Sequence, residues 1–307
     1  MLGFVMKKLF SLLLALLGLF VLTFMLIYFT PGDPVDALLG DFAPPADKER
    51  MREAMGLTKP VRVQLYDALT GVLKGDLGTS FKTDAPVWSM IWERLPSTIL
   101  LGFGALSFAL PVGLSFGFLA AAHKSGALDK FAKFYMTAAF CMPSFWFGPI
   151  LILLFSVWWP LFPLGGQDGF SSLVLPSVTL GLPMSAVLTK LVRDSILGAG
   201  EAQYVKLARA KGLTEDAILS EHVWPNVRIP VFTMVFLQMG ALLTGAILTE
   251  AIFQWPGVGS LLIESIHSRD YPVLQGCVLF IGVVYMFMNV LSDIVAACLD
   301  PRILKGE

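Results

Sequence analysis

Long runs of apolar residues alternate with short polar segments along this chain. Residues 9–29 hold no charged side chain, and further runs cover 97–122, 134–158, 173–191, 229–252 and 273–299. A helix of about 20 apolar residues crosses roughly 30 Å of hydrocarbon. The pattern therefore predicts an all-α, polytopic membrane protein with six transmembrane helices. The fourth run is the least regular, because Pro176, Pro183 and Lys190 interrupt it.

Composition agrees with a membrane location and points away from several other classes. Hydrophobic residues make up 56% of the 307 residues and charged residues 15%, with a mean hydropathy of +0.73, whereas soluble domains carry about 25% charged residues. The formal net charge of -1 indicates no nucleic-acid partner. The three Cys and three His are scattered, and the thirteen Met read as apolar packing residues, so no metal site is predicted.

Basic residues beside short loops predict the orientation of the spans. Those before the first span, between the second and third, between the fourth and fifth, and after the sixth all fall on one side. That side is therefore predicted to be cytoplasmic, with both termini on it. The long segment 31–96 also carries basic residues, but long loops cross largely regardless of charge. The basic residues that set the orientation include Lys7, Lys8, Lys124, Lys130, Lys133, Arg193, Lys206, Arg209, Lys211, Arg228, Arg302 and Lys305.

These assignments divide the chain into four parts. Residues 1–30 form an N-terminal transmembrane helix, and 31–96 form an external loop with short amphipathic helices near 47–55 and 59–73. Residues 97–299 form a five-helix core, and 300–307 form a cytoplasmic tail.

The cytoplasmic segment 201–230 has the sequence of a helical hairpin. Residues 201–211 are helix formers, Gly212 stands where a glycine closes a helix, and Thr214 stands where a second helix is capped. Pro225 and Pro230 are expected to break up the chain after this second helix. The hairpin is either a solvated connection between two spans or a docking element for a soluble partner.

The residues of this hairpin resemble a known motif. Tyr-Val-Lys-Leu-Ala-Arg-Ala-Lys-Gly at 204–212, followed by Pro230, is similar to the "EAA" loop of permease subunits in ATP-binding-cassette importers. Lys206 departs from the family's leading Glu, but this form of the motif is that of the peptide and nickel branch. The resemblance implies that an ATPase-coupling helix is formed by Tyr204, Lys206, Ala208, Arg209, Ala210, Lys211 and Gly212.

Further segments resemble the first of the two permeases in dipeptide, oligopeptide, glutathione and nickel importers. They lie at 31–34, 75–81, 93–98, 143–148, 250–259, 269–276 and 299–303. The resemblance implies the type I importer permease fold in a bacterial inner (plasma) membrane, where 31–96 would be periplasmic. It also implies the partners: a second homologous permease, two ATPase subunits that hold ATP and Mg, an external solute-binding protein and membrane lipid.

No catalytic motif for ATP hydrolysis is present in this chain. A phosphate-binding loop needs Gly-Lys-Ser/Thr, and the chain has no Gly-Lys dipeptide. We therefore expect a transport subunit and not an enzyme, and no cofactor of its own. Imported peptides are the predicted substrate, with glutathione and nickel or a metallophore as alternatives.

Polar residues in the fifth apolar run are candidates for solute contact. In the resembled family this span lines the translocation path, which makes Gln238, Thr244 and Glu250 candidates. Helix packing, or for Glu250 a place at the membrane interface, is the simpler interpretation.

The family resemblance implies that the last external loop forms an external gate or docks the binding protein. A turn and a short amphipathic helix are predicted there, and the alternative is a membrane-surface plug with aromatic anchors. The residues concerned are Trp255, Pro256, Gly257, Gly259, Asp270 and Tyr271.

Two other classes of protein fit less well. An ion-coupled secondary transporter tends to place ionisable groups near the bilayer midplane and to show internal repeats. A membrane-embedded enzyme needs convergent polar groups within its spans. The sequence shows neither pattern clearly.

Overall fold

The computed structural model describes residues 2–29, 32–40 and 42–299, which are predominantly helical. The only β-type contact among them is an isolated bridge between Thr79 and Pro86. The expected tail 300–307 lies outside the described residues. The elements are α1 Leu2–Phe29, α2 Pro34–Leu39, α3 Pro45–Ala54, α4 Val61–Leu73, α5 Val87–Ala122, α6 Ala127–Cys141, α7 Ser144–Ile152, the π-helix η1 Leu153–Trp158, α8 Phe170–Gly200, α9 Gln203–Ala210, α10 Glu215–Ala217, the π-helix η2 Ile218–Val223, α11 Trp224–Ile252, α12 Val258–Ser268 and α13 Tyr271–Leu299.

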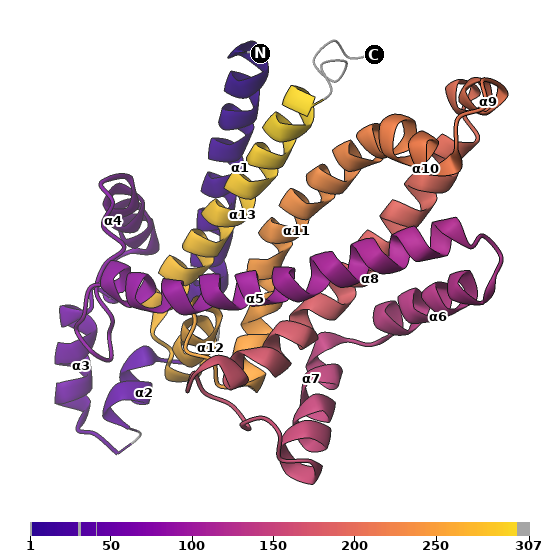
Figure 1. The fold of residues 1–307 in the computed structure, drawn as a ribbon. Helices are drawn as coiled ribbons and strands as arrows, with labels where there is room; N and C mark the ends of the chain where they lie inside the picture. The colour runs from indigo at the N-terminus through magenta and orange to yellow at the C-terminus, as the bar shows by residue number, and fades with distance from the viewer. Residues whose placement is uncertain (1, 30–31, 41, 300–307) are drawn as a thin grey trace.

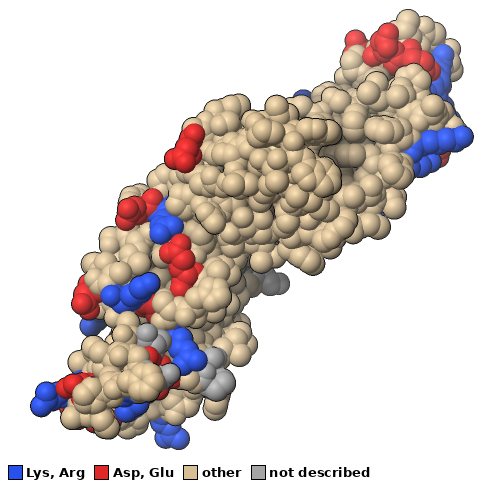
Figure 2. All heavy atoms as spheres, turned by 90° about the horizontal axis from the view of Figure 1, so that it is seen from below, with Lys and Arg blue, Asp and Glu red and all other residues tan. Residues whose placement is uncertain are grey.

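The long helices run between two ends of the molecule (Figure 1). The start of α1, the end of α13 and the short helices α9 and α10 lie at one end, whereas α2, α3 and α12 lie at the other. Four helices of the described chain are long and apolar enough to cross a membrane, or six if each bent pair is one span. Charged side chains gather at the extremities of the face in Figure 2 and leave a broad uncharged belt between them. The predicted all-α membrane architecture is therefore confirmed.

The predicted span 134–158 is not one straight helix. Its residues are divided between α6 and the pair α7–η1, whose axes meet at 101°. Pro143 lacks an N–H and disfavours a helical conformation of the residue before it. Met142 is accordingly extended, with φ -95° and ψ 106°. The third span thus contains a sharp break that hydropathy did not reveal.

The fourth span is deeply packed and regular. Its helix α8 continues through Pro176 and Pro183 and packs along α5. A Cβ atom on Gly113 or on Gly117 of α5 would lie 2.6 Å from the Cβ atom of Leu188 or Val192 of α8. Small residues four apart allow such close helix contact. Our interpretation of the prolines as interruptions was wrong, because tight packing against α5 supports the helix.

The sequence of residues 113–117 in α5 matches a motif that also occurs in enzymes. They read Gly-Leu-Ser-Phe-Gly and so match the pattern Gly-x-Ser-x-Gly of a hydrolase nucleophile turn. That turn joins a strand to a helix, whereas this segment lies inside α5. Its glycines serve helix packing.

The prolines after the hairpin do not break the chain as we expected. Pro225 lies in the first turn of α11, where its missing N–H is harmless. Pro230 lies within the same helix, which continues to Ile252. The irregularity precedes them, in the π-helical turn η2.

The segment between α1 and α5 folds as short helices beside the end of α1 and the start of α13. The helices expected near 47–55 and 59–73 are α3 and α4. Asp33 caps α2 by accepting a hydrogen bond from the Val35 N–H at 2.9 Å, and Arg52 of α3 donates to the same carboxylate. Lys48 of α3 pairs with Asp36 of α2 at 2.8 Å, which lowers the pKa of the Asp36 carboxyl. These contacts fasten α2 to α3.

Candidate functional site

The hairpin α9–α10–η2 is held against the ends of two long helices. Val205 and Ala208, three residues apart on α9, are buried, at 0% and 3% exposure. They join an apolar cluster with Val192 of α8, Ile218 of η2 and Val227 of α11. One face of α9 therefore packs against α8 and η2, and η2 in turn packs against α11.

The turn between the two short helices is built as the sequence predicts. Gly212 has φ +81°, a left-handed conformation that favours glycine. The Thr214 hydroxyl accepts a hydrogen bond from the Ala217 N–H at 3.4 Å. Arg209 donates to both carboxylate oxygens of Glu215, at 2.7 and 3.0 Å, and this contact raises the pKa of Arg209. The turn is closed by local contacts.

The opposite face of α9 is open. Leu207 is 58% exposed, and Tyr204, whose hydroxyl accepts a hydrogen bond from the Asn226 amide of α11 at 3.3 Å, is 43% exposed at the edge of this face. An exposed leucine and tyrosine on a short helix form an apolar surface suited to a groove in another protein. The other predicted coupling residues divide between the two faces: Lys206, Arg209, Ala210, Lys211 and Gly212 are exposed, whereas Ala208 is buried. Ala208 therefore supports the helix from inside. The coupling role itself stays a prediction.

Glu250 lies at the centre of a second cluster, at the far end of α11. Its side chain is fully buried. It accepts a hydrogen bond from the Thr98 hydroxyl of α5 at 2.7 Å and another from the Ser260 N–H of α12 at 3.0 Å. A Cβ atom on Gly257 would collide with its carboxylate. Within this chain Glu250 is enclosed by packing contacts that connect α5, α11 and α12. Its predicted solute contact stays a prediction.

The turn between α11 and α12 is part of the same enclosure. The Trp255 side chain is fully buried and donates its indole N–H to the Ser97 carbonyl at 2.8 Å. Thr98 also accepts a hydrogen bond from the Val258 N–H at 2.9 Å, which ties the start of α12 to α5. A Cβ atom on Gly259 would lie 2.5 Å from the Ile247 Cα atom. The turn is therefore locked onto α5 and α11.

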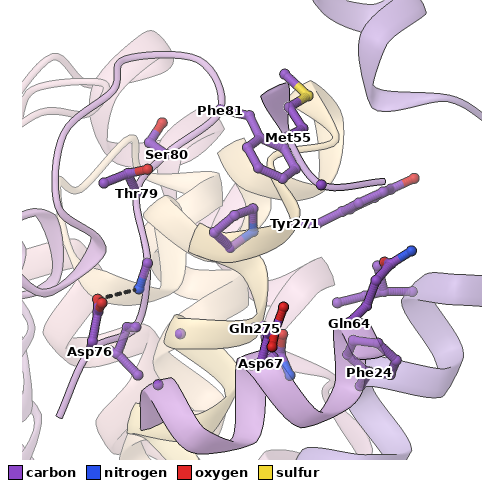
Figure 3. Close-up of a pocket in the computed structure, with 18 of the residues that line it drawn as sticks. Phe24, Met55, Gln64, Asp67, Asp76, Thr79, Ser80, Phe81, Tyr271 and Gln275 are labelled. Carbon is purple, nitrogen blue, oxygen red and sulfur yellow. Dashed lines mark hydrogen bonds between the residues drawn. The ribbon is translucent and has the colours of Figure 1, made fainter. Parts of the chain in front are cut away.

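The residues at the start of α13 connect this region to the segment between α1 and α5 (Figure 3). Asp270, which is 4% exposed, accepts hydrogen bonds from the Ser80 hydroxyl and the Phe81 N–H. Arg269 lies against Gly32, where a Cβ atom would collide with its guanidinium group. The Tyr271 hydroxyl donates to the Gly32 carbonyl at 3.3 Å. Separate sequence motifs thus meet at one end of the molecule.

The residues predicted to gate the path or to dock a partner mostly face inward in this structure. Trp255, Gly257, Gly259 and Asp270 are buried, and Pro256 and Tyr271 are half-buried. They hold this end of the molecule together, so any docking surface there is formed by neighbouring exposed residues. The gate and docking roles stay predictions.

The two remaining path candidates both belong to α11. Gln238 is 9% exposed, and its amide nitrogen has no hydrogen-bond partner among the described residues. Gly240 packs against α13, with Met288 and Tyr285 as its neighbours. The backbone of Thr244 is helical, but its side chain lies outside the described part of the structure.

An ion cluster that the sequence did not predict joins α6 to α8 near the hairpin. Asp129 is fully buried and receives hydrogen bonds from Arg193 at 2.6 and 3.3 Å and from the Ser125 N–H at 3.0 Å. Lys133 lies 3.0 Å from the same carboxylate. Asp129 and Arg193 each stand close to an apolar run, but their separation of 64 residues conceals the pairing.

Comparison with known proteins places these features in context. Residues 113–305 match the family model described as "Binding-protein-dependent transport system inner membrane component", and residues 1–102 match the model of the N-terminal part of such membrane components. The dipeptide transport system permease protein DppB of Escherichia coli K12 is 35% identical, over 99% of both chains. The glutathione transport system permease protein GsiC of Pectobacterium atrosepticum is 36% identical, also over 99% of both chains.

A solved structure also resembles the chain. The structure of the MetNI methionine ABC transporter in inward-facing conformations matches 69% of this chain and 95% of the solved chain, with 16% sequence identity and a TM-score of 0.48.

Proposed function

The chain belongs to the family of binding-protein-dependent transport system inner membrane components, and we propose that it forms one half of the translocation pathway of an importer for short peptides. It is a permease subunit of an ATP-binding-cassette importer and not an enzyme, and it works with ATPase and binding-protein partners. The proposal adds the substrate, the coupling surface and the orientation.

The exposed face of α9 is the observation that supports coupling of this chain to an ATPase subunit. Its partner surface consists of Leu207 and Tyr204, which are open to contact, while Val205 and Ala208 anchor the helix to α8 and α11. An ATPase that grips the outer face would therefore move both long helices. On this proposal α9 and both termini lie in the cytoplasm, and the start of α1, the end of α13 and α9 occupy the same end of the molecule (Figure 1). A second homologous permease and two ATPase subunits complete the complex, with ATP and Mg on the ATPases.

Short peptides are the proposed substrate class because of the relatives. The names of DppB and GsiC refer to dipeptide and glutathione transport, and glutathione is itself a tripeptide. Glutathione is therefore the second candidate substrate. The predicted nickel alternative has less support, since neither of these names refers to nickel.

Uptake assays in a strain that lacks this chain test both parts of the proposal. Cells complemented with the wild type are given labelled dipeptide, glutathione or nickel separately. Leu207→Asp places a charge on the exposed face of α9, and we expect uptake to fall at least tenfold while the protein stays in the membrane. Leu73→Asp is the matched control, because Leu73 is 75% exposed at the end of α4 in the external segment. Equal uptake by the two variants would rule out the coupling face, and uptake of nickel alone would rule out the peptide substrate.

A further inference from the structure

Three of the membrane helices each carry a proline at the same level of the bundle. Pro111 lies inside α5, Pro183 lies inside α8, and Pro143 marks the break between α6 and α7. Helix α8 is the most deeply buried of the straight spans, and its contacts set the level of the other two prolines. Pro183 lies about 20 Å from the start of α8 and about 26 Å from its end, so the shared level is in the middle of the span.

Helix α5 runs parallel to α8, and two close contacts place its proline level with that of α8. A Cβ atom on Gly181 of α8 would lie 2.9 Å from the ring of Phe108 of α5. A Cβ atom on Gly113 of α5 would lie 3.0 Å from the carbonyl oxygen of Ser185 of α8. These contacts lie on either side of the proline in each helix, so the two prolines share one level.

The break in the third span lies at this level as well. Before the break, the hydroxyl of Tyr135 in α6 is hydrogen-bonded to that of Ser185 in α8. After the break, a Cβ atom on Gly148 of α7 would lie 3.5 Å from the Thr179 methyl carbon of α8. The proline of α8 lies between these two contacts. We call the set the proline layer, and it comprises Pro111, Pro143 and Pro183.

The backbone is weakened in each helix at this layer. Proline has no N–H, so the carbonyl four residues earlier loses its helical donor, and in α5 and α8 these carbonyls belong to Ser107 and Thr179. At Pro143 the helix is interrupted altogether. Helix α11 has Gly245 near this level, packed against Leu180 of α8, and glycine stiffens a helix less than other residues do. Because sharp bends in helices occur mostly at such positions, the bundle is easier to bend here than elsewhere.

The helices are fastened firmly on the hairpin side of the layer. Asp129 of α6 pairs with Arg193 of α8, with the closest atoms 2.6 Å apart. Phe116 of α5 makes edge-on ring contacts with Phe131 and Tyr135 of α6, at centroid distances of 5.8 and 5.1 Å. Helix α6 and the adjoining ends of α5 and α8 therefore form one packed unit.

A second packed unit lies on the α12 side of the layer, around Phe253 at the end of α11. A Cβ atom on Gly148 of α7 would lie 3.2 Å from the Phe253 ring, and the Gly166 N–H donates to the Phe253 carbonyl at 2.9 Å. Leu151 of α7 and Leu175 of α8 join Phe253 in one apolar cluster. Helix α7, the start of α8 and the end of α11 are thus held together.

We infer that the bundle bends at the proline layer, and that the unit on the α12 side tilts as one body against the unit on the hairpin side. The contacts within each unit are closely packed, whereas the helices that connect the units are weakened at one common level. The inference concerns flexibility within this chain. Only the use of that flexibility in a transport cycle rests on the proposed function.

Distances between spin labels in the purified full chain, reconstituted in lipid nanodiscs, test this inference. One pair crosses the layer, at Phe134 of α6 and Val157 of η1. Two control pairs stay on one side of it, Phe134 with Leu119 of α5 and Val157 with Phe170 of α8. All four positions are exposed. A bend of about 20° on the arm of about 20 Å from Pro143 to Val157 moves the label by about 7 Å, so the crossing pair should show this spread and the control pairs should not.

Alanine variants test whether the prolines cause the bend. The double variant Pro111→Ala with Pro183→Ala restores two N–H groups and should narrow the spread of the crossing pair about twofold. Pro176→Ala is the matched control, because Pro176 lies in the same helix two turns before the layer, and it should leave the spread unchanged. Thermal unfolding in detergent checks that each variant is folded. Pro111→Ala alone, at an exposed position, replaces the double variant if that one does not fold.

Two results would overturn the inference: equal spreads for all three pairs in the wild type, or the same spread in the proline variant as in the wild type. The importer with its ATPases then tests the use of the bend. Trapped nucleotide should shift the crossing distance by about 7 Å and leave the control distances unchanged, and a crossing distance that does not shift would contradict a role in transport. Failure to recover any ATPase would instead contradict the proposed function, and the distances in the chain alone would still decide whether the layer bends.

Discussion

Thr98→Val removes one hydroxyl from the end of the molecule where α12 lies and keeps the shape of the side chain. Thr98 is 4% exposed, donates to Glu250 at 2.7 Å and accepts from the Val258 N–H at 2.9 Å. The variant leaves that N–H buried without an acceptor, which costs about 1–3 kcal/mol, and it removes a hydrogen bond worth about 1 kcal/mol. The α11–α12 turn should therefore lose about 3 kcal/mol of local stability.

Amide hydrogen exchange of α12 measures this loss directly. A decrease of about 3 kcal/mol corresponds to roughly a hundredfold faster exchange at Val258 if local opening controls the rate. Thr98→Ser retains the hydroxyl and should exchange within about tenfold of the wild type. If Thr98→Val and Thr98→Ser exchange at the same rate, the hydroxyl does not hold the turn and the role we give to Thr98 is wrong.

Three further variants test other parts of the structure. Asp129→Ala removes the buried carboxylate that Arg193 and Lys133 share and leaves Arg193 only its more exposed pair with Asp194, so it should lower the free energy of unfolding by about 3 kcal/mol, measured by thermal unfolding in detergent; an unchanged midpoint would contradict the buried pair. Gly259→Ala forces a Cβ atom to within 2.5 Å of the Ile247 Cα atom and should open the α11–α12 turn to added protease, whereas wild-type resistance would refute the close contact. Gly212→Ala should destabilise the hairpin by about 1 kcal/mol because of its left-handed backbone, and Gly212→Asn by less; equal effects on hydrogen exchange would count against this explanation.

The spans and the hairpin were predictable because their signals are local. An uncharged run of the right length indicates a span wherever it occurs, and Gly212 and Thr214 each act within one turn of their own position. The break at Met142–Pro143 also had a local signal, since proline restricts the residue before it. Apolar continuity through Pro143 outweighed that signal in our prediction.

The features that the sequence did not reveal depend on residues far apart in the chain. Helix α8 continues through its prolines in close contact with α5, where Gly104 of α5 leaves room for Ser177 next to Pro176, and no pattern within α8 indicates this contact. Asp129 and Arg193 are paired across 64 residues. The enclosure of Glu250 likewise depends on Thr98, which belongs to a different motif. The motifs could be recognised in the sequence, but their contacts with one another are visible only in the folded structure.

Affinity purification of the tagged chain from its native membrane, beside the Leu207→Asp variant, tests the central claim most directly. We expect ATPase subunits and a second permease to accompany the wild type, and the ATPases to be lost from Leu207→Asp while the second permease remains. A stable wild-type chain purified alone, or equal recovery of the ATPases with both proteins, would contradict the proposal that α9 couples this permease to its motor.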